Sequence, residues 1–196
     1  MIKRNLMLFF GLFLLIAVTG TPVLASGNNL PIHLKFAGAF SNNVVYVPDP
    51  ENPTEFAFGA LAHVLARGFP GRAVVRSFGA VPGGPPSMEP CYLQDSTPGT
   101  EFPVAQNPIV LTFVWDNSLL YGTGPGEICV DFTTGRAEFE FRIAITGGRG
   151  YFQSSTGHLV LKGESEPVGV DLSGPFPVPL NLNAETGTIK GVAILQ

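Results

Sequence analysis

Few residues in this 196-residue chain have the types and spacing that catalysis or metal binding requires. The three histidines, His33, His63 and His158, are scattered, and the two cysteines, Cys91 and Cys129, do not form a CxxC pair. Such a set does not match the ligand spacing of a zinc site. We therefore expect no metal and no cofactor, and the sequence leaves the catalytic residues unknown.

Three residues are candidates for binding a ligand. His63 lies in the apolar stretch Ala-Leu-Ala-His-Val, and Trp115 and Tyr121 flank a predicted hairpin whose turn is Asp116-Asn117. An exposed aromatic ring at that hairpin could stack on a sugar or a phenolic ligand. The structural alternative is a core histidine and a core tryptophan beside a turn, and it stays open for each of them.

Glu138 and Glu140 are the one pair of carboxylates with suggestive spacing. Residues two apart on a strand point to the same face, and paired carboxylates can serve glycosidic chemistry. Arg142 follows on the same face, so we favour a solvated or ion-paired arrangement. The chain also lacks the Gly-x-Ser-x-Gly elbow of a hydrolase.

The first 25 residues have the pattern of a secretory signal peptide. Lys3 and Arg4 precede an apolar run over residues 6–18, and Val-Leu-Ala at 23–25 offers a cleavage site. The run is shorter than the roughly 20 residues that a transmembrane helix needs. We expect residues 1–25 to be removed and residues 26–196 to form one secreted or periplasmic domain, with no membrane as a partner after cleavage; the alternative is an uncleaved anchor.

Loss of Lys3 and Arg4 changes the formal charge from −4 to −6, and the remaining basic residues form no cluster in the sequence. This excludes the electrostatic footprint of a nucleic-acid-binding protein. In an exported chain, Cys91 and Cys129 are expected to form one disulfide that closes a loop of about 39 residues. The alternative is two buried free thiols.

The chain after residue 25 reads as short strands separated by turns. Charged residues are only 13%, whereas 24 glycines and 18 prolines supply the turns. Residues 55–66 are ambiguous between strand and helix, and residues 81–90 are a predicted loop. In 137–145, Phe139, Phe141 and Ile143 share one face. The other predicted strands cover residues 32–40, 44–47, 72–78, 109–115, 119–121, 128–132, 158–162 and 188–195.

This pattern predicts an all-β fold, most simply an antiparallel β-barrel of about eight strands. Strands at both ends of the mature chain could pair and close the barrel, which removes exposed edges.

One segment resembles a known family. Residues 143–157 read Ile-Ala-Ile-Thr-Gly-Gly-Arg-Gly-Tyr-Phe-Gln-Ser-Ser-Thr-Gly, which resembles a motif of allene oxide cyclase-like and dirigent-like barrels, including uncharacterised secreted bacterial proteins. Arg149 and Tyr151 depart from that motif, and residues 185–189 resemble the closing strand of such barrels. The positions that match are Gly147, Gly148, Gly150, Phe152, Ser155, Thr156 and Gly157.

The glycine motif has a structural explanation. Gly147 and Gly148 permit a tight turn, Gly150 and Gly157 allow close backbone approach, and Phe152 can anchor the segment by burial. The run also resembles a phosphate-binding loop, but neither a following helix nor a Gly-Lys-[Ser/Thr] sequence is present.

The resemblance implies a barrel with an apolar cavity. Allene oxide cyclases isomerise a fatty-acid epoxide in such a cavity, and dirigent proteins steer the coupling or cyclisation of phenolic intermediates there. None of their pocket residues can be matched to this chain. We expect a secreted, non-enzymatic barrel that binds a small apolar or phenolic ligand in its lumen. One alternative is an isomerase, cyclase or dirigent-type protein, and another is a structural domain with a filled core; homo-oligomerisation is left open.

Overall fold

The fold was examined in a computed structural model, which describes residues 28–45, 57–81, 90–168, 170–171, 178–179 and 182–196. The predicted signal peptide and most of the loop predicted at 81–90 lie outside these residues. Within the described part of the chain, no helix is long and apolar enough to cross a membrane.

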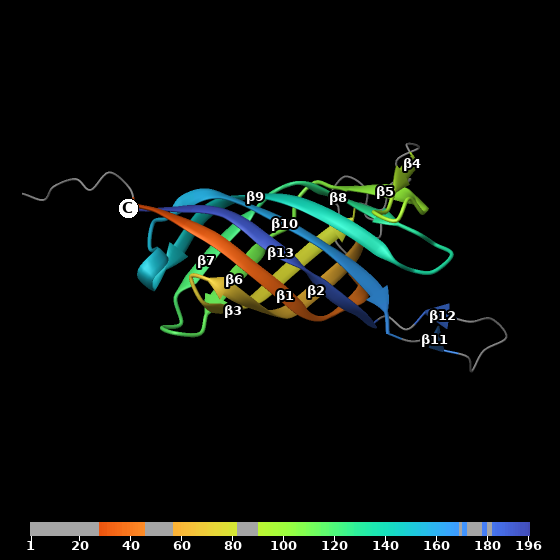
Figure 1. The fold of residues 1–196 in the computed structure, drawn as a ribbon, viewed down its shortest axis with the longest axis horizontal. Helices are drawn as coiled ribbons and strands as arrows, with labels where there is room; N and C mark the ends of the chain where they lie inside the picture. Colours follow the sequence, from red (N-terminus) through yellow and green to blue (C-terminus); the bar gives the residue numbers. More distant parts are fainter. Residues whose placement is uncertain (1–27, 46–56, 82–89, 169, 172–177, 180–181) are drawn as a thin grey trace, which may run out of the picture.

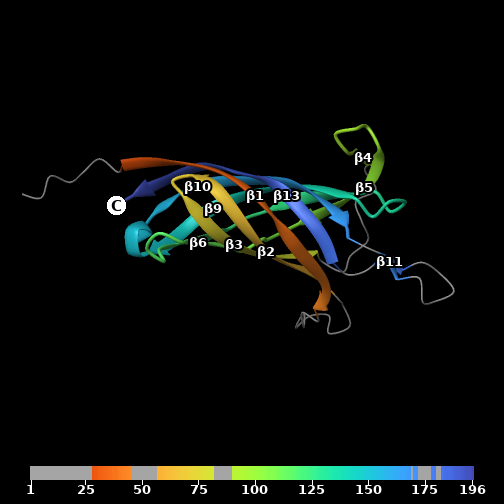
Figure 2. The ribbon, with the colours of Figure 1, turned by 60° about the horizontal axis from the view of Figure 1, so that its bottom comes forward.

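Eight antiparallel strands form a closed barrel (Figures 1 and 2). Each strand pairs with the next around the barrel, and the pairing of β9 with β10 closes the ring. The predicted all-β, eight-stranded barrel is therefore confirmed. In order around the barrel, the strands are β1 (Asn28–Val45), β2 (Ala57–Phe69), β3 (Arg72–Val81), β6 (Ile109–Phe113), β7 (Leu119–Thr123), β9 (Ala137–Arg149), β10 (Thr156–Pro167) and β13 (Leu182–Leu195).

Short elements extend one side of the barrel. The strand β8 (Gly126–Val130) pairs with the first half of β9, whereas β7 pairs with its second half. The strand β5 (Pro98–Val104) pairs with β8, and β4 (Pro90–Tyr92) pairs with β5. A small ribbon, β11 (Val170–Asp171) and β12 (Val178–Pro179), projects near the end of β10 (Figure 1).

The ring closes in part through the two ends of the chain. Asn28 of β1 lies opposite Leu195 of β13, and the pairing continues to Ser41 opposite Leu182. Alternation along β1 directs Ile32, Leu34 and Phe36 inward, whereas His33 and Lys35 are exposed. A period of two is what places alternate residues on the two faces of a strand.

A 3-10 turn, η1 (Gly150–Phe152), marks one end of the barrel, together with the β2–β3 and β6–β7 turns (Figure 1). We call this the η1 end. The interior there is filled, as expected for a barrel of eight strands. Its fully buried side chains include Ile32, Phe113, Leu120, Ile143, Phe152, Leu159 and Ala193.

Two local predictions were wrong, and one ambiguous segment is resolved. The predicted turn at 41–43 is absent, because β1 continues to Val45 in register with β2. Residues 147–149 extend β9 rather than forming a turn, and the reversal occurs at η1. The ambiguous segment at 55–66 lies mostly in β2, whose pairing with two long strands overrides its local helical character.

The predicted disulfide is confirmed. Cys91 in β4 is bonded to Cys129 in β8, and their Cα atoms are 5.9 Å apart. The bond ties the short outer strands β4 and β5 to the sheet at the end of the barrel opposite η1.

Candidate functional site

Polar side chains gather inside the barrel at the end opposite η1, which we call the Glu185 end. Large apolar side chains fill the η1 end instead. Among the buried polar or charged side chains in the described part of the chain, Asp131 lies at this end in the β8–β9 turn, where it accepts hydrogen bonds from Thr133 and Thr134. Five others at this end belong to the barrel strands or to the crossing from β5 to β6, namely Ser77, Asn107, Ser165, Asn183 and Glu185.

Glu185 is the one ionisable residue of these five. Its strand position lies between Gly38 on β1 and Ser165 on β10. It shares the inward face of β13 with Ile189, which is fully buried, and Glu185 itself is only 8% exposed. The carboxyl group therefore lies against the barrel interior, away from water.

Two phenylalanine rings close the interior directly beneath Glu185. Phe36 and Phe139 stack with ring centroids 6.4 Å apart and planes at 20°. Each ring occupies space that a glycine leaves free: a Cβ at Gly163 would lie 2.5 Å from the Phe139 ring, and one at Gly187 would overlap Phe36. The candidate site thus has an aromatic floor and a carboxyl group above it.

Burial raises the pKa of Glu185 to about 7. Removal from water disfavours the charged form of a carboxyl group, and this is the cause of the shift. The Oε2 atom of Glu185 has no hydrogen-bond partner among the described residues. A buried polar atom without a partner is destabilising, and titratable groups with strongly shifted pKa values cluster at functional sites. Ser155 Oγ and Thr123 Oγ1 likewise lack a partner in the described part of the chain, but neither is ionisable at neutral pH.

The opposite wall of this end is also polar, but its Ser77 and Asn107 side chains form a hydrogen bond with each other. The Ser77 hydroxyl donates a hydrogen bond of 2.6 Å to Asn107 Oδ1, and the Asn107 backbone N–H donates to the Gly124 carbonyl at 2.8 Å. These bonds fix the crossing from β5 to β6 against β3 and β7. Glu185 differs from them, because its carboxyl group retains hydrogen-bonding capacity.

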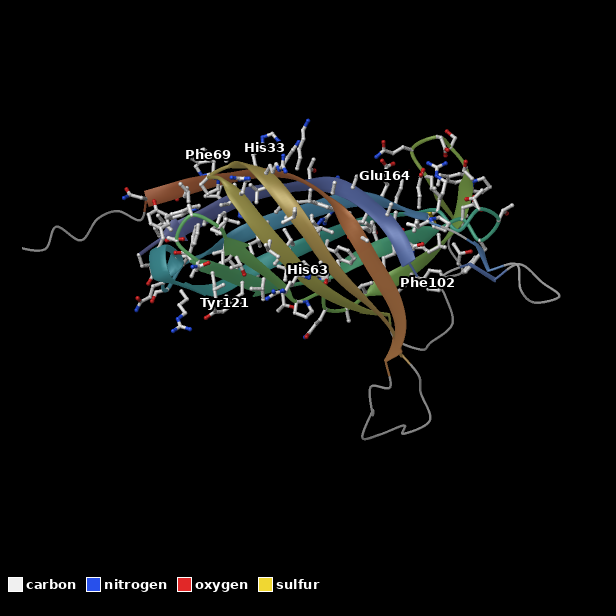
Figure 3. All side chains as sticks on the ribbon, turned by 90° about the horizontal axis from the view of Figure 1, so that it is seen from below. His33, His63, Phe69, Phe102, Tyr121 and Glu164 are labelled. Atoms are coloured by element: carbon white, nitrogen blue, oxygen red, sulfur yellow. A yellow bond between two sulfur atoms is a disulfide. The ribbon has the colours of Figure 1, made fainter. Side chains whose placement is uncertain are left out.

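The candidate ligand-binding residues from the sequence lie elsewhere. His63 is exposed on the outer face of β2, while the next residue, Val64, points inward. Tyr121 lies on the outer face of β7, and Trp115 follows β6 at the η1 end, where about half of its surface is exposed. None of the three lines the interior. His63 and Tyr121 lie on the same outer side of the barrel (Figure 3), in one row of the register that passes through Arg76 on β3 and Val110 on β6. That they bind a ligand stays a prediction, and it now concerns the outer surface.

The glycine motif builds the η1 end. Phe152 is fully buried and stacks on Phe113 with ring centroids 4.7 Å apart. Gly150 has a φ of +68°, and Gly148 lies so close to the Phe152 carbonyl that a side chain would overlap it. A φ in this range strains residues with a Cβ, which explains why glycine suits the turn. These residues shape the filled end, far from Glu185.

A hollow of about 260 Å³ lies on the outer face of β8 and β9, beside the disulfide. Its walls carry Glu138 and Glu140, the carboxylate pair noted in the sequence. Glu140 accepts from Lys162 Nζ at 2.6 Å and from Arg142 Nε at 3.3 Å. The hydrogen bond from Lys162 is the main reason that the pKa of Glu140 is lowered. The ion-paired arrangement favoured from the sequence is what the structure shows.

No group of three or more His, Cys, Asp or Glu side chains among the described residues could hold a metal ion.

Sequence reasoning missed Glu185, although a signal was present. Residues 185–189 were interpreted as a closing strand, and alternation places Glu185 on the same face as Ile189. A charged residue in phase with the apolar face of a strand is the signal that could have identified it. The register with Ser165 and Gly38 could not be read from one strand alone.

Comparisons with known proteins give little further information. No protein-family model matches the chain, and no curated protein matches it. Among solved structures, the pterocarpan synthase dirigent protein GePTS1 aligns with 90% of this chain and 96% of its own, at 14% identity and a TM-score of 0.24. Similarity at this level carries no argument here, so the barrel rests on the strand pairing described above.

Proposed function

We propose that the barrel binds one small, largely apolar ligand, carrying a phenolic hydroxyl or a similar polar group, at its Glu185 end. The buried Oε2 atom of Glu185, which has no hydrogen-bond partner among the described residues, carries this proposal. Ligand pockets in proteins are mostly apolar and contain a few polar groups that fix the orientation of the ligand. Here the floor of Phe36 and Phe139 would contact the apolar body, and Glu185 would bond its polar group.

The pKa of Glu185, about 7, suits a ligand whose polar group is uncharged. Near neutral pH the carboxyl group exists in both protonation states, so it can donate a hydrogen bond to a carbonyl or accept one from a phenol. An anionic ligand would need a cationic counter-group, and no Lys or Arg belongs to the buried polar residues of this end. A cationic ligand would compete with the protonated form of Glu185, which burial favours. The ligand class that fits is therefore neutral.

A second candidate function rests on the same residue. A carboxyl group with a pKa near the ambient pH suits general acid–base catalysis, because it can both give and take a proton. In that function the barrel would isomerise or cyclise its ligand, with Glu185 transferring the proton. The sparse ionisable groups of the sequence favour binding, and Glu185 is the specific observation that keeps catalysis as an alternative.

The disulfide also bears on where the protein acts. Disulfides form and persist in oxidising compartments, and the bond between Cys91 and Cys129 therefore supports an exported protein. Together with the leader-like first 25 residues, we propose that the chain is secreted or periplasmic. A role as a purely structural domain would require the Glu185 end to be as tightly filled as the η1 end.

Native mass spectrometry of the protein purified from its own host tests the proposed function. We expect one small organic molecule on the wild type, lost or weakened in Glu185→Gln, and retained in Glu164→Gln. Glu164 is the matched control, because it lies on the adjacent strand β10 but is exposed (Figure 3). A ligand-free wild type that also fails to bind 2-naphthol, an apolar phenol, at millimolar concentration would contradict the proposal.

Binding and catalysis can then be separated. The released ligand is returned to fresh protein in deuterated water, and deuterium on its carbon atoms is measured. Incorporation with the wild type and not with Glu185→Gln would support proton transfer by Glu185. A ligand that binds and stays unlabelled would support a binding protein.

A further inference from the structure

The η1 end carries a group of exposed apolar side chains that the proposed function does not use. Each is about half exposed, and two of them directly adjoin fully buried anchors, since Val114 follows Phe113 and Tyr151 precedes Phe152. They come from three separate turns, which Figures 1 and 2 show together at this end. We call this group the aromatic tip; its members are Phe69, Val114, Trp115 and Tyr151.

The aromatic tip is held in place by its packing. Trp115 contacts Tyr151 edge-on, with centroids 5.4 Å apart and planes at 73°. It also lies over Gly71, where a Cβ would be 3.2 Å from the indole ring. The Val114 backbone N–H donates to the Arg72 carbonyl at 2.9 Å, which ties the β6–β7 turn to β3. A rigid tip keeps these side chains exposed instead of letting them fold back onto the barrel.

Basic side chains lie just behind the tip on the outer face of the barrel. Arg72, Arg67 and Lys35 are directly opposite one another on β3, β2 and β1. One step closer to the tip, His33 lies opposite both Phe69 and Lys190. All are exposed, and Figure 3 shows His33 beside Phe69. The sequence separates these residues widely, which is why no basic cluster was evident there.

These basic residues lack acidic partners in the described part of the chain. The ion pairs found there use Arg136, Arg142 and Lys162. The described acid of the tip region is Asp116, which accepts hydrogen bonds from the Ser118 backbone N–H and hydroxyl group. Like charges directly opposite on neighbouring strands are unfavourable by themselves. An anionic partner would relieve this repulsion.

We infer that the η1 end docks on an anionic lipid surface. Phe69, Val114, Trp115 and Tyr151 would enter the interfacial region, where aromatic side chains are favoured, and the basic side chains one layer behind would meet the headgroup phosphates. The order of the two layers, apolar side chains foremost and cations behind, is the order that such a surface requires.

Two features distinguish a lipid surface from other partners. A sugar polymer stacks best on rings that share a plane, whereas Trp115 and Tyr151 are nearly perpendicular. A second copy of this chain would have to present acids to the cations, and the acidic side chains of the outer hollow lie on the other side of the ring, around β8 and β9. Contact between those two faces would be head-to-tail and would not cover the aromatic tip.

Vesicle binding tests this inference, and Trp115 is a built-in probe because it is the chain's sole tryptophan. The protein, purified as its host processes it, is mixed with phosphatidylglycerol–phosphatidylcholine vesicles and with pure phosphatidylcholine vesicles. We expect a blue shift of the Trp115 fluorescence and co-sedimentation with the anionic vesicles. Arg67→Gln with Arg72→Gln should weaken this binding by about 25-fold, a factor of roughly five for each charge.

The control variant is Arg76→Gln. Arg76 lies on the same outer face of β3 as Arg72, but four residues farther along the strand from the tip. This variant should bind nearly as the wild type does. Tyr151→Ser should reduce the blue shift while circular dichroism stays unchanged. Equal affinity for both vesicle types, or equal losses in Arg76→Gln and in the paired variant, would overturn the inference. A dimer that buries Trp115 without vesicles would overturn it in favour of self-association.

Discussion

Glu185 on β13 lies directly opposite Ser165 on β10, and both side chains are buried on the inner face of the barrel. This pairing puts a carboxyl group and a hydroxyl group above the stacked rings of Phe36 and Phe139. The barrel interior is thus divided: the η1 end is filled by apolar side chains, and the Glu185 end keeps an acid that titrates near neutral pH. The predictions below test that division.

The first prediction concerns the pH dependence of stability. The pKa of Glu185 is about 7 in the folded protein, against an ordinary value of 4.5, so the folded state holds this proton more tightly. Stability should therefore fall as the pH rises from about 4.5 to about 7 and level off above that. The loss due to this residue is on the order of 3 kcal/mol. Glu185→Gln, which cannot ionise, should lack it.

Urea unfolding across this pH range measures the effect as the difference between the wild type and Glu185→Gln. Other shifted groups cancel in the difference, including Asp95, whose pKa is lowered to about 2 mainly by a hydrogen bond to Thr97. A flat curve for this difference would show that the Glu185 carboxyl group is hydrated.

The second prediction concerns the anchor of the η1 end. Phe152 is fully buried against Phe113, so Phe152→Ala should lower the free energy of unfolding by about 3–5 kcal/mol. Its neighbour Tyr151 is half exposed, and Tyr151→Ala should have a much smaller effect. Denaturant unfolding at one pH compares the two; similar losses would mean that Phe152 is not the anchor.

The third prediction concerns Gly148. A Cβ there would overlap the Phe152 carbonyl and lie 2.6 Å from the Leu119 carbonyl. The Leu119 carbonyl belongs to β7, which is paired with β9, and the Phe152 carbonyl accepts a hydrogen bond from the Ser155 backbone N–H at 3.0 Å, so neither moves freely. Gly148→Ala should therefore be destabilising by at least 1–3 kcal/mol. Gly71→Ala is the control, because its nearest neighbour is the Trp115 side chain at 3.2 Å. A melting temperature of Gly148→Ala equal to that of the control would rule out this close approach.

The fourth prediction concerns the disulfide. Cys91 and Cys129 are 38 positions apart, and breaking the bond frees the unfolded chain from a loop of that size. Replacing both with serine should lower the free energy of unfolding by about 3–4 kcal/mol. Because β4 and β5 lie outside the closed ring, the barrel itself should still form. Near-native far-ultraviolet circular dichroism is expected; its loss would mean that the barrel depends on this bond.

The class of fold could be predicted from the sequence because alternation and turn residues are local signals. The structure confirms the prediction that Phe139, Phe141 and Ile143 share one inward face, and it also confirms the predicted disulfide and the predicted pairing of the two terminal strands. Strand lengths were underestimated, since Asn42 and Asn43 favour turns locally while their pairing with β2 holds them in β1.

The candidate site was harder to predict because it depends on register. Glu185 becomes a buried acid only when Ser165 and Gly38 flank it, and both are distant in sequence. The same holds for the outer face, where Lys35, Arg67 and Arg72 become neighbours through strand pairing. One shift of register would have moved every side chain of a strand to the other face.

The most direct test of the account is an NMR titration of the Glu185 side-chain carboxyl carbon, with the signal assigned by its absence in Glu185→Gln. The expected result is a midpoint near pH 7, as for an acid buried inside the barrel. A midpoint at or below the ordinary value of 4.5 would contradict the account, because the carboxyl group would then be hydrated or paired with a cation.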